Sequence, residues 1–579
     1  MSRRLQGLPA SPGVAVGPAW WFRRAAAASL RVRAEDAPAE RARLAAARAQ
    51  AVAELQALLE AQRDRLPPEE RAIFEAQALM LEDPELLARV EEGLAGGLSA
   101  EAAWSQAVEA FAAQLAALPD PYFQARAADV RDIGNRVLRH LVGAPAEAGM
   151  PDHPVVVVAD ELLPSETVTL DPGRVLAFVM AGGGPTAHAA ILARRLGVPA
   201  VVAVGPALHQ VAEGALLVVD GEAGWVEVDP APEVVHAAQA RRDLWLQHRQ
   251  QAAREALGPA YTRDGLRIEV AANVGSLADA QQAARAGADG VGLLRTEFLY
   301  LGRTAAPTEE EEAAAYRALL EAMGGRPVVV RTLDVGGDKP LPYLPMPQEA
   351  NPFLGVRGVR LSRQHPELLR QQLRALLRAG VGFPLRIMFP MVSTVEEIRW
   401  LRAVFEEVRR ALEARGDPLP QDLQIGMMVE VPSAALLAEH FLPWVDFFSV
   451  GTNDLAQYTL AADRTHPVVA GMADGLHPAV LRLIRMVTEA AVPAGRWVGV
   501  CGELAGDPLA VPLLIGLGVR ELSVNPVRIP EVKAAVRRWS LAEAEALARE
   551  ALRQESAEGV RRLVQAALER AAPDQGQTR

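Results

Sequence analysis

The chain has 579 residues, which is too long for one hydrophobic core and predicts two to four domains. Its net charge of −12 at pH 7 speaks against a nucleic-acid scaffold, because binding a polyanion needs a concentrated basic face. The single cysteine, Cys501, excludes a disulfide within the chain. No apolar run reaches the roughly 18 residues that span a bilayer and no secretory signal opens the chain, so we expect a cytoplasmic protein without a membrane partner.

The N-terminal part of the chain alternates between two kinds of pattern. Turn residues around a short apolar alternation at 8–18 predict a strand that leads into a domain. Between 37 and 141 apolar residues recur at helical spacing, with breaks that divide the region into several helices. We therefore expect an all-helical insert of residues 23–143.

Strand-like runs return after the insert. They lie at 155–159, 175–180, 201–204 and 216–219, and a helix is expected over 185–196. These runs predict a compact α/β domain that also includes the N-terminal strand, so that the domain consists of residues 1–22 and 144–230. A helical stretch, 231–258, is expected to link this domain to the rest of the chain.

Beyond the linker, short apolar runs alternate with long helical patterns. The runs lie at 268–272, 290–294, 328–330, 385–388, 425–429, 447–450 and 497–500. A further strand, the fourth in order, is expected near 353–356. This rhythm over 259–573 predicts a (β/α)8 barrel with insertions, and residues 574–579 are expected to be a disordered tail.

His188 follows a glycine-rich turn at the start of the helix expected in the α/β domain. Gly182, Gly183 and Gly184 permit backbone conformations that a side chain would block, and Pro185 suits the first position of a helix. A phosphorylated imidazole in the first helical turn would meet free backbone N–H groups and the positive end of the helix dipole. The alternative is a helix-capping loop with an incidental histidine.

Arginines follow two of the expected barrel strands. Arg295 comes after 290–294 and Arg331 after 328–330. Because the chemistry of such barrels is built at the C-terminal ends of the strands, two guanidinium groups would face one mouth. Such a pair suits a ligand with a carboxylate and a phosphate. The alternative for each single arginine is a salt bridge.

Carboxylates and the cysteine follow the later strands. The expected sixth run ends in Glu430, and the seventh is followed by Asn453 and Asp454, with Arg464 shortly beyond. Two carboxylates that converge with a phosphate ligand are typical of a Mg2+ site. Cys501 closes the expected eighth run, and a thiol that is protonated at neutral pH could donate a proton to an enolate. Turn formation and core filling are the alternatives.

The chain resembles enzyme I of the phosphoenolpyruvate:sugar phosphotransferase system over nearly its whole length. Besides the His188 loop, the motifs that carry the resemblance are Ala10-Ser11-Pro12-Gly13, Arg126-Ala127-Ala128-Asp129-Val130-Arg131-Asp132-Ile133-Gly134, Arg295-Thr296-Glu297-Phe298, Arg331-Thr332-Leu333-Asp334-Val335-Gly336-Gly337-Asp338-Lys339, Asn351-Pro352-Phe353-Leu354-Gly355, Gly451-Thr452-Asn453-Asp454-Leu455 and Cys501-Gly502-Glu503-Leu504-Ala505-Gly506. The resemblance implies a multidomain fold in which the phosphohistidine domain swivels relative to the barrel.

The resemblance also implies roles for individual residues. His188 would accept a phosphoryl group from phosphoenolpyruvate, and Cys501 would protonate the enolate to give pyruvate. Phosphoenolpyruvate would be bound by Arg295, Arg331, Arg357, Asn453, Asp454 and Arg464. Glu430 and Asp454 would hold Mg2+. The helical insert would dock the histidine-containing phosphocarrier protein HPr, with residues 69–86 as the docking candidate, and the barrel would form a homodimer.

The sequence departs from the family pattern at a few positions. Pro185 stands where relatives usually have a basic residue, and Ala187 and Ala189 replace hydroxyl residues beside His188. Gln77 replaces an expected histidine in the insert. These changes bear on how the phosphohistidine is oriented and which carrier is recognised.

Two other functions are consistent with parts of the pattern. A pyruvate-phosphate dikinase or phosphoenolpyruvate synthase would share the histidine domain and the barrel, but it would carry an ATP-binding domain before them, and no phosphate-cradling glycine-rich loop precedes the histidine here. A catalytically silent docking protein would retain the fold. The intact set of histidine, arginines, carboxylates and cysteine speaks against that reading.

Overall fold

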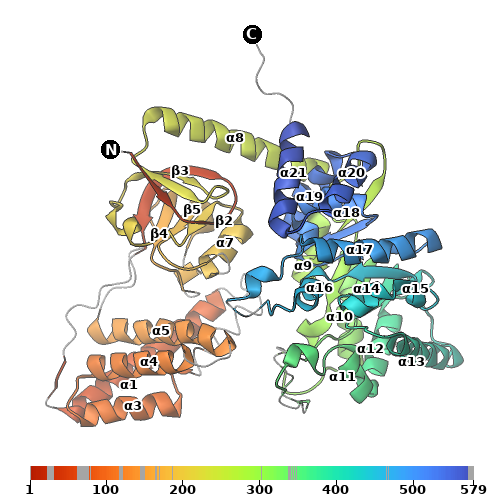
Figure 1. Ribbon diagram of the computed structural model, residues 1–579. Coiled ribbons are helices and arrows are strands. Elements are labelled where there is room, and N and C mark those ends of the chain that lie inside the picture. The colour runs from red at the N-terminus through yellow and green to blue at the C-terminus, as the bar shows by residue number, and fades with distance from the viewer. Residues whose placement is uncertain are drawn as a thin grey trace. The chain divides into compact units, whose positions relative to one another are not determined.

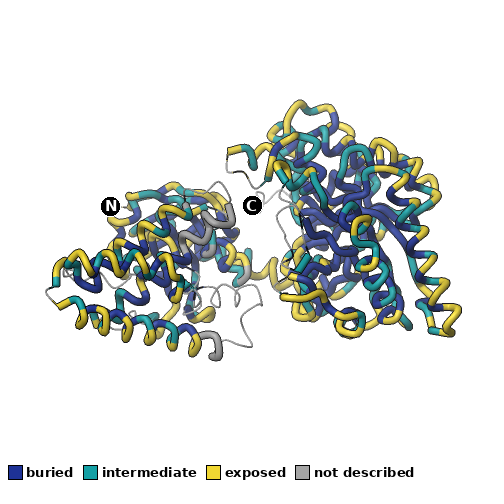
Figure 2. The backbone as a smooth tube through the Cα atoms, turned by 90° about the horizontal axis from the view of Figure 1, so that it is seen from below, coloured by how far each residue is buried: buried dark blue, intermediate teal, exposed yellow. Residues whose placement is uncertain are grey.

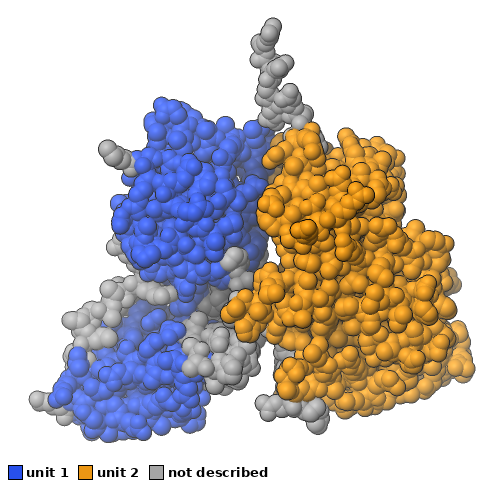
Figure 3. All heavy atoms as spheres, viewed as in Figure 1, with its two compact units in different colours: residues 1–247 blue, residues 248–579 orange. Residues whose placement is uncertain are grey.

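The computed structural model is shown in Figure 1. It describes residues 2–22, 32–34, 36–61, 77, 80–116, 121–143, 150–163, 166–167, 170–184, 187–301, 303–336, 341, 343–344, 346, 349–464, 466 and 468–571. The chain forms two compact units, Met1–Gln247 and His248–Arg579 (Figure 3). Within the described residues, no helix is long and apolar enough to cross a membrane.

One mixed sheet of eight strands forms the α/β part of the first unit, in the order β1-β8-β7-β3-β4-β5-β6-β2. Its strands are β1 (Arg3–Gln6), β2 (Leu8–Ser11), β3 (Val14–Trp21), β4 (Val155–Ala159), β5 (Val175–Met180), β6 (Ala200–Val202), β7 (Leu216–Asp220) and β8 (Trp225–Val228). β3 pairs in parallel with β4, with Trp21 opposite Val158. The N-terminal strands therefore share one sheet with the strands that follow the helical insert.

Helix α7 (His188–Leu196) packs on this sheet through its small and apolar residues. Ala189, Ala190 and Ala193 share one buried cluster with Val157 and Phe178 of the sheet. The helix ends at Gly197, whose left-handed backbone (φ 67) lets its N–H bond back to carbonyls of the last turn. The helix is therefore fixed on the sheet by its buried face, and His188 lies in its first turn.

The insert consists of helices around a separate apolar core. They are α1 (Ala37–Ala61), α3 (Pro84–Ala95), α4 (Ala100–Ala116) and α5 (Pro121–Val142). Trp104 is fully buried in this core, and its indole N–H donates to the carbonyl of Gly134 at 3.0 Å. A Cβ on Gly134 would lie 2.4 Å from Val108, so glycine permits the close packing of α4 against α5. Most of the docking candidate, 69–86, lies outside the described residues.

Helix α8 (Pro232–Glu255) carries the chain from the first unit into the second, where eight parallel strands close into a barrel. The barrel strands are β10 (Arg267–Val274), β11 (Val291–Arg295), β12 (Val328–Arg331), β13 (Leu385–Phe389), β14 (Leu423–Val429), β15 (Phe447–Val450), β16 (Trp497–Val500) and β17 (Glu521–Val524), with β9 (Ala260–Tyr261) paired to β10 at the rim. β10 also pairs with β11, which closes the ring. Figure 2 shows the buried backbone that runs through this unit. The predicted barrel is confirmed.

The outer helices follow the strands in the βα order of such barrels. The longer ones are α9 (Leu277–Arg285), α10 (Glu309–Ala322), α11 (Val359–Gln364), α12 (Pro366–Ala379), α13 (Val395–Ala414), α16 (Thr452–Leu460), α17 (Pro478–Ala491), α18 (Ala510–Gly516) and α19 (Ile529–Arg537), and α20 (Leu541–Ala551) and α21 (Ala557–Ala571) extend the unit. Capping boxes begin α10, α13 and α20 at Thr308, Thr394 and Ser540.

One barrel strand differs from the prediction. The expected fourth strand near 353–356 is wrong: the segment contains a short 3-10 turn, Pro352–Leu354, on the long connection after β12. The strand that the sequence did not reveal is β17, the last of the eight. Its Leu522 and Val524 face the main core, while a Cβ on Gly292 would touch Glu521 and Ser523 inside the barrel. Because two of its four residues are polar and face inward, β17 does not appear as a continuous apolar run. With no strand at 353–356, β14, β15 and β16 are the fifth, sixth and seventh barrel strands, one place earlier than predicted.

Candidate active site

Arg295 and Arg331 end neighbouring strands and lie in register as partners of the β11–β12 ladder. Arg295 is exposed, whereas Arg331 is 6% exposed. The Arg331 guanidinium pairs with Glu297 and, at 2.9 Å, with Asp334. Burial by itself lowers the pKa of Arg331, but these two carboxylates raise it above its ordinary value. Arg331 is therefore a permanent buried cation at the barrel mouth.

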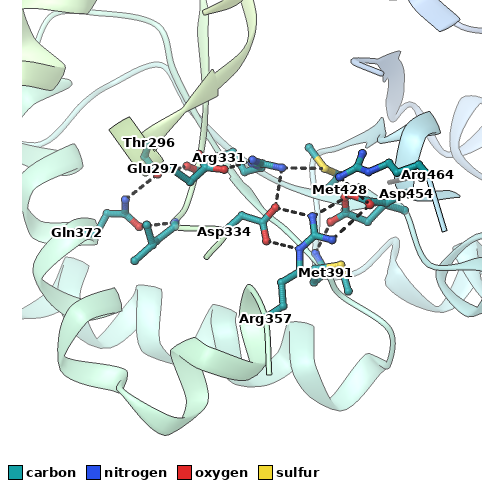
Figure 4. Close-up of polar contacts among 12 residues, drawn as sticks. Thr296, Glu297, Arg331, Asp334, Arg357, Gln372, Met391, Met428, Asp454 and Arg464 are labelled. Atoms are coloured by element: carbon teal, nitrogen blue, oxygen red, sulfur yellow. Dashed lines mark hydrogen bonds and ion pairs between the residues drawn. The ribbon is translucent and has the colours of Figure 1, made fainter. Parts of the chain in front are cut away.

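Arg357 lies between two carboxylates, as Figure 4 shows. Its Nε and Nη2 donate to Asp334 at 3.0 and 2.9 Å, and Nη1 and Nη2 donate to Asp454 at 3.3 and 2.8 Å. Arg464 completes the chain of charges, with Nη2 3.4 Å from Asp454. Positive and negative groups thus alternate across the mouth, which compensates the cost of burying each of them.

Glu430 follows β14 and is 1% exposed. Its Oε1 accepts a 2.6 Å hydrogen bond from the backbone N–H of Met391, whose left-handed backbone (φ 57) is one of the few among described non-glycine residues. Burial, followed by the nearby Asp454 and Asp334, raises the pKa of Glu430 to about 8, although Arg357 and Arg331 act in the opposite direction. A carboxyl in this setting needs either a proton or a further cation, so the donor set fits a divalent metal.

Asn453 and Cys501 lie at the ends of β15 and β16. The Oδ1 of Asn453 accepts the backbone N–H of Glu503 at 2.9 Å. A Cβ on Gly502 would lie 2.0 Å from the hydroxyl of Thr452, so a glycine is needed where these two strand ends meet.

The Cys501 thiol is 3% exposed and lies 3.7 Å from the carbonyl of Val450. Burial raises its pKa to about 11. The group is therefore a protonated thiol at neutral pH, which is the state that a proton donor needs.

His188 lies in the first turn of α7, as predicted, but the helix begins at His188 and not at about 185, and Ala187 is its N-cap residue without a side-chain hydrogen bond. The His188 side chain, Pro185 and Thr186 lie outside the described structure. His188 belongs to the first unit and the barrel residues belong to the second.

The structure thus brings Arg331, Arg357, Asp454 and Arg464 into one network, places Glu430 within their electrostatic reach, and sets the remaining barrel residues on adjoining strand ends. Glu297 and Asp334 were not predicted as site residues, although both stand within motifs that carry the family resemblance. Their signal was a carboxylate two or three residues after each strand-end arginine.

Three family models match this chain. Residues 249–541 match the PEP-binding domain of PEP-utilising enzymes, residues 151–224 their mobile domain and residues 6–126 their N-terminal domain.

Curated relatives match over most of the chain. A multiphosphoryl transfer protein of Rhodobacter capsulatus is 46% identical over 97% of this chain and 67% of its own. The phosphoenolpyruvate-protein phosphotransferase of Geobacillus stearothermophilus is 42% identical over 94% of both chains. That of Staphylococcus carnosus (strain TM300) is 41% identical over 98% of this chain and 99% of its own. The chain therefore belongs to the family of PEP-utilising enzymes, among the phosphoenolpyruvate-protein phosphotransferases.

Proposed function

We propose that this chain transfers the phosphoryl group of phosphoenolpyruvate to its own His188 and then to a histidine of the phosphocarrier protein HPr, as the first step of the sugar phosphotransferase system. The observation that carries the proposal is the buried network of Arg331 and Arg357 with Asp334 and Asp454 at the C-terminal end of the barrel. Phosphoryl transfer depends chiefly on positioning and charge neutralisation, and this network supplies fixed cations for both.

The arginines would bind the substrate through its carboxylate and phosphate groups. Arg295 is exposed beside the buried Arg331, so their guanidinium groups can offer paired hydrogen bonds to a ligand that enters from solvent. Asn453 follows β15, and Arg464, which is one-third exposed, lies beyond α16 beside Asp454. Arg357 is buried and would contact the substrate's phosphate from the protein interior, and its four hydrogen bonds to carboxylates hold its guanidinium in place.

Glu430 and Asp454 would hold Mg2+, with Asp454 also facing the substrate. The raised pKa of Glu430 supports this role, because a metal ion would replace the proton that the buried carboxyl otherwise keeps. Mg2+ ordinarily takes one or two carboxylates from a protein when phosphate oxygens and water complete its shell. When bound, Mg2+ would neutralise charge that develops on the phosphoryl group.

The bond changes assign a role to each remaining residue. The Nε2 of His188 would attack phosphorus, so that a P–N bond forms while the P–O bond to the enolate breaks. Cys501 would give its proton to the enolate carbon, producing pyruvate, and the thiolate would regain a proton from solvent. In the second half-reaction the phosphoryl group would leave His188 for the histidine of HPr.

His188 and the substrate-binding residues of the barrel belong to different units of the chain, which supports a histidine domain that swings between the barrel and HPr. We assign residues 1–22 and 144–230 to that domain, 23–143 to HPr docking, 231–258 to the linker and 259–573 to a barrel that also forms the homodimer. Segments near 143–154 and 229–232 would be the hinges. An engineered disulfide between the histidine domain and the insert should abolish labelling from phosphoenolpyruvate, and a locked protein that labels at full rate would refute the swing.

Labelled phosphoenolpyruvate with Mg2+ tests the proposed function. We expect acid-labile label on the wild type without any need for ATP, and no label on His188→Ala. His248→Ala, which removes an exposed histidine of α8, is the matched control and should label like the wild type. Label on His188→Ala, or none on the wild type, would refute the proposal.

A further inference from the structure

A buried amide on helix α12 connects the ends of the two strands that carry the substrate-binding arginines. Gln372 is 1% exposed, and its Oε1 accepts the backbone N–H of Leu333 at 2.9 Å. Its Nε2 donates to the hydroxyl of Thr296 at 3.2 Å and to that of Tyr316 at 2.9 Å. Since the Leu333 N–H can only donate, the amide can adopt this orientation alone.

The hydroxyl of Thr296 passes the connection on to Arg331. Its Oγ1 donates to the backbone carbonyl of Arg331 at 3.0 Å, and Thr296 is fully buried. The β11–β12 ladder ends with the pair Arg295–Arg331. Gln372 and Thr296 thus continue the connection between the two chain segments beyond the point where backbone pairing stops (Figure 4).

Two of the three contacts of the amide lie next to a carboxylate that holds Arg331. Thr296 precedes Glu297, and Leu333 precedes Asp334. Glu297 and Asp334 are the two acidic partners of the Arg331 guanidinium, and Asp334 also holds Arg357. A shift of either backbone segment would therefore move a counter-ion and, with it, the guanidinium that the counter-ion orients.

We propose that Gln372 is a positioning residue for phosphoenolpyruvate binding, which acts through Thr296 to hold the Arg295 and Arg331 strand ends in register. It touches neither substrate nor metal. The proposal rests on the proposed function, because it concerns how that site binds its substrate.

Replacement of the amide tests the proposal. Gln372→Leu retains the bulk but removes all three hydrogen bonds, and we expect kcat/KM for phosphoenolpyruvate to fall by about ten- to a hundredfold, chiefly through KM, since small misplacements of binding groups have effects of this size. Thr296→Val, which removes the hydroxyl, should also raise KM for phosphoenolpyruvate. Thr296→Ser, which retains the hydroxyl, should restore the wild-type value.

The matched control is Gln371→Leu, on the same helix. Gln371 bonds the carbonyl of Pro307 and the carboxylate of Glu312, away from the arginines, so KM should stay within about twofold of wild type. All constants are measured below the unfolding temperature of each variant. Should Gln372→Leu fail to fold, the pair Thr296→Val and Thr296→Ser decides the matter.

Three outcomes would overturn the proposal: an unchanged KM in Gln372→Leu, an equal rise in Gln371→Leu, or a failure of Thr296→Ser to restore it. A wild-type protein that takes no label from phosphoenolpyruvate would instead refute the proposed function. Label on the wild type with unchanged variants would refute only the role of Gln372.

Discussion

Arg357 and Asp454 form a buried pair joined by two hydrogen bonds, 2.8 and 3.3 Å long, although they lie 97 residues apart in the chain. The same guanidinium is also held by Asp334. One guanidinium thus holds two carboxylates that follow different strands. A change of Arg357 should therefore affect both carboxylates at once.

Replacement of Arg357 separates charge from geometry. Arg357→Lys keeps the charge but cannot bind two carboxylates through paired hydrogen bonds, so it should fold and lose about a hundredfold in kcat/KM for phosphoenolpyruvate. Arg357→Leu leaves the carboxylates without their cation and should also lower the free energy of unfolding by about 3–5 kcal/mol. Urea unfolding and steady-state kinetics measure the two effects.

Arg363→Leu is the control for this pair, since it removes an exposed arginine from α11. The only ring contact of Arg363 among the described residues is with Trp400, 5.8 Å from the ring centroid, so the change should cost no more than about 1 kcal/mol. Wild-type kinetics in Arg357→Lys would contradict the role assigned to the guanidinium.

The raised pKa of Cys501 predicts how the thiol reacts. Because the chain has one cysteine, buried with a pKa of about 11, the native protein should resist iodoacetamide at pH 8, whereas protein unfolded in urea should be alkylated fully. Mass spectrometry reads the single adduct directly. Equal alkylation rates in both states would show that the thiol is an accessible, ionised group.

Replacement of Cys501 by serine tests its function separately. A hydroxyl is a weaker acid than a thiol, so Cys501→Ser should slow turnover of phosphoenolpyruvate while leaving its binding nearly unchanged. Substrate affinity measured by calorimetry is the control. A parallel loss of affinity would indicate that the thiol shapes the pocket instead.

Glu312 on α10 makes stability depend on pH. Burial raises its pKa from 4.5 to about 7, against the hydrogen bonds from Tyr300 and Gln371. A folded-state pKa above the unfolded one means that the stabilisation is fully present below pH 4.5 and is lost as pH rises through about 7. Glu312→Gln still accepts the hydrogen bond from Tyr300 but cannot ionise. Its free energy of unfolding should therefore rise relative to that of the wild type by up to about 3 kcal/mol between pH 5 and pH 8.

Urea midpoints across this pH range measure that difference. Glu310→Gln, which alters an exposed carboxylate on the same helix, should show no such trend. A constant difference between Glu312→Gln and wild type at pH 5 and pH 8 would mean that Glu312 ionises normally.

Lys533 binds backbone carbonyls at the start of the barrel unit, and we expect it to affect the stability of the protein but not its substrate binding. Its fully buried Nζ donates to the carbonyls of Ala256, Gly258 and Gly287 at 3.0, 2.9 and 2.7 Å, and it lies 3.0 Å from a carboxylate oxygen of Asp289. Lys533→Met leaves these acceptors without the ammonium group and should lower the free energy of unfolding by about 3–5 kcal/mol.

KM for phosphoenolpyruvate should be unchanged in Lys533→Met, because the ammonium group does not belong to the network at the mouth. Arg538→Met, an exposed change just beyond α19, is the control and should be nearly neutral. A stability of Lys533→Met equal to that of the control would show that water replaces the ammonium group without cost.

Local patterns were enough to predict much of this site. Strands that are buried on both sides appear as continuous apolar runs, so the residues that follow them, such as Arg331, Asp454 and Cys501, could be assigned to one end of a barrel. The prediction failed where the pattern was not local. In β17, Glu521 and Ser523 face the barrel interior, where Gly292 and Gly499 leave room for Glu521 and the Ser523 hydroxyl donates to Oδ1 of Asn273 at 2.7 Å.

By itself, the sequence determined the fold class, the order of most elements and the residue types at the strand ends, because periodicity and turn chemistry act over a few neighbouring residues. The tertiary structure decided which charges share partners. Asp334 between Arg331 and Arg357, and Gln372 behind Thr296, depend on segments that meet only when the barrel closes. Pairing energies at such contacts depend on distances in space, which no local pattern of residues encodes.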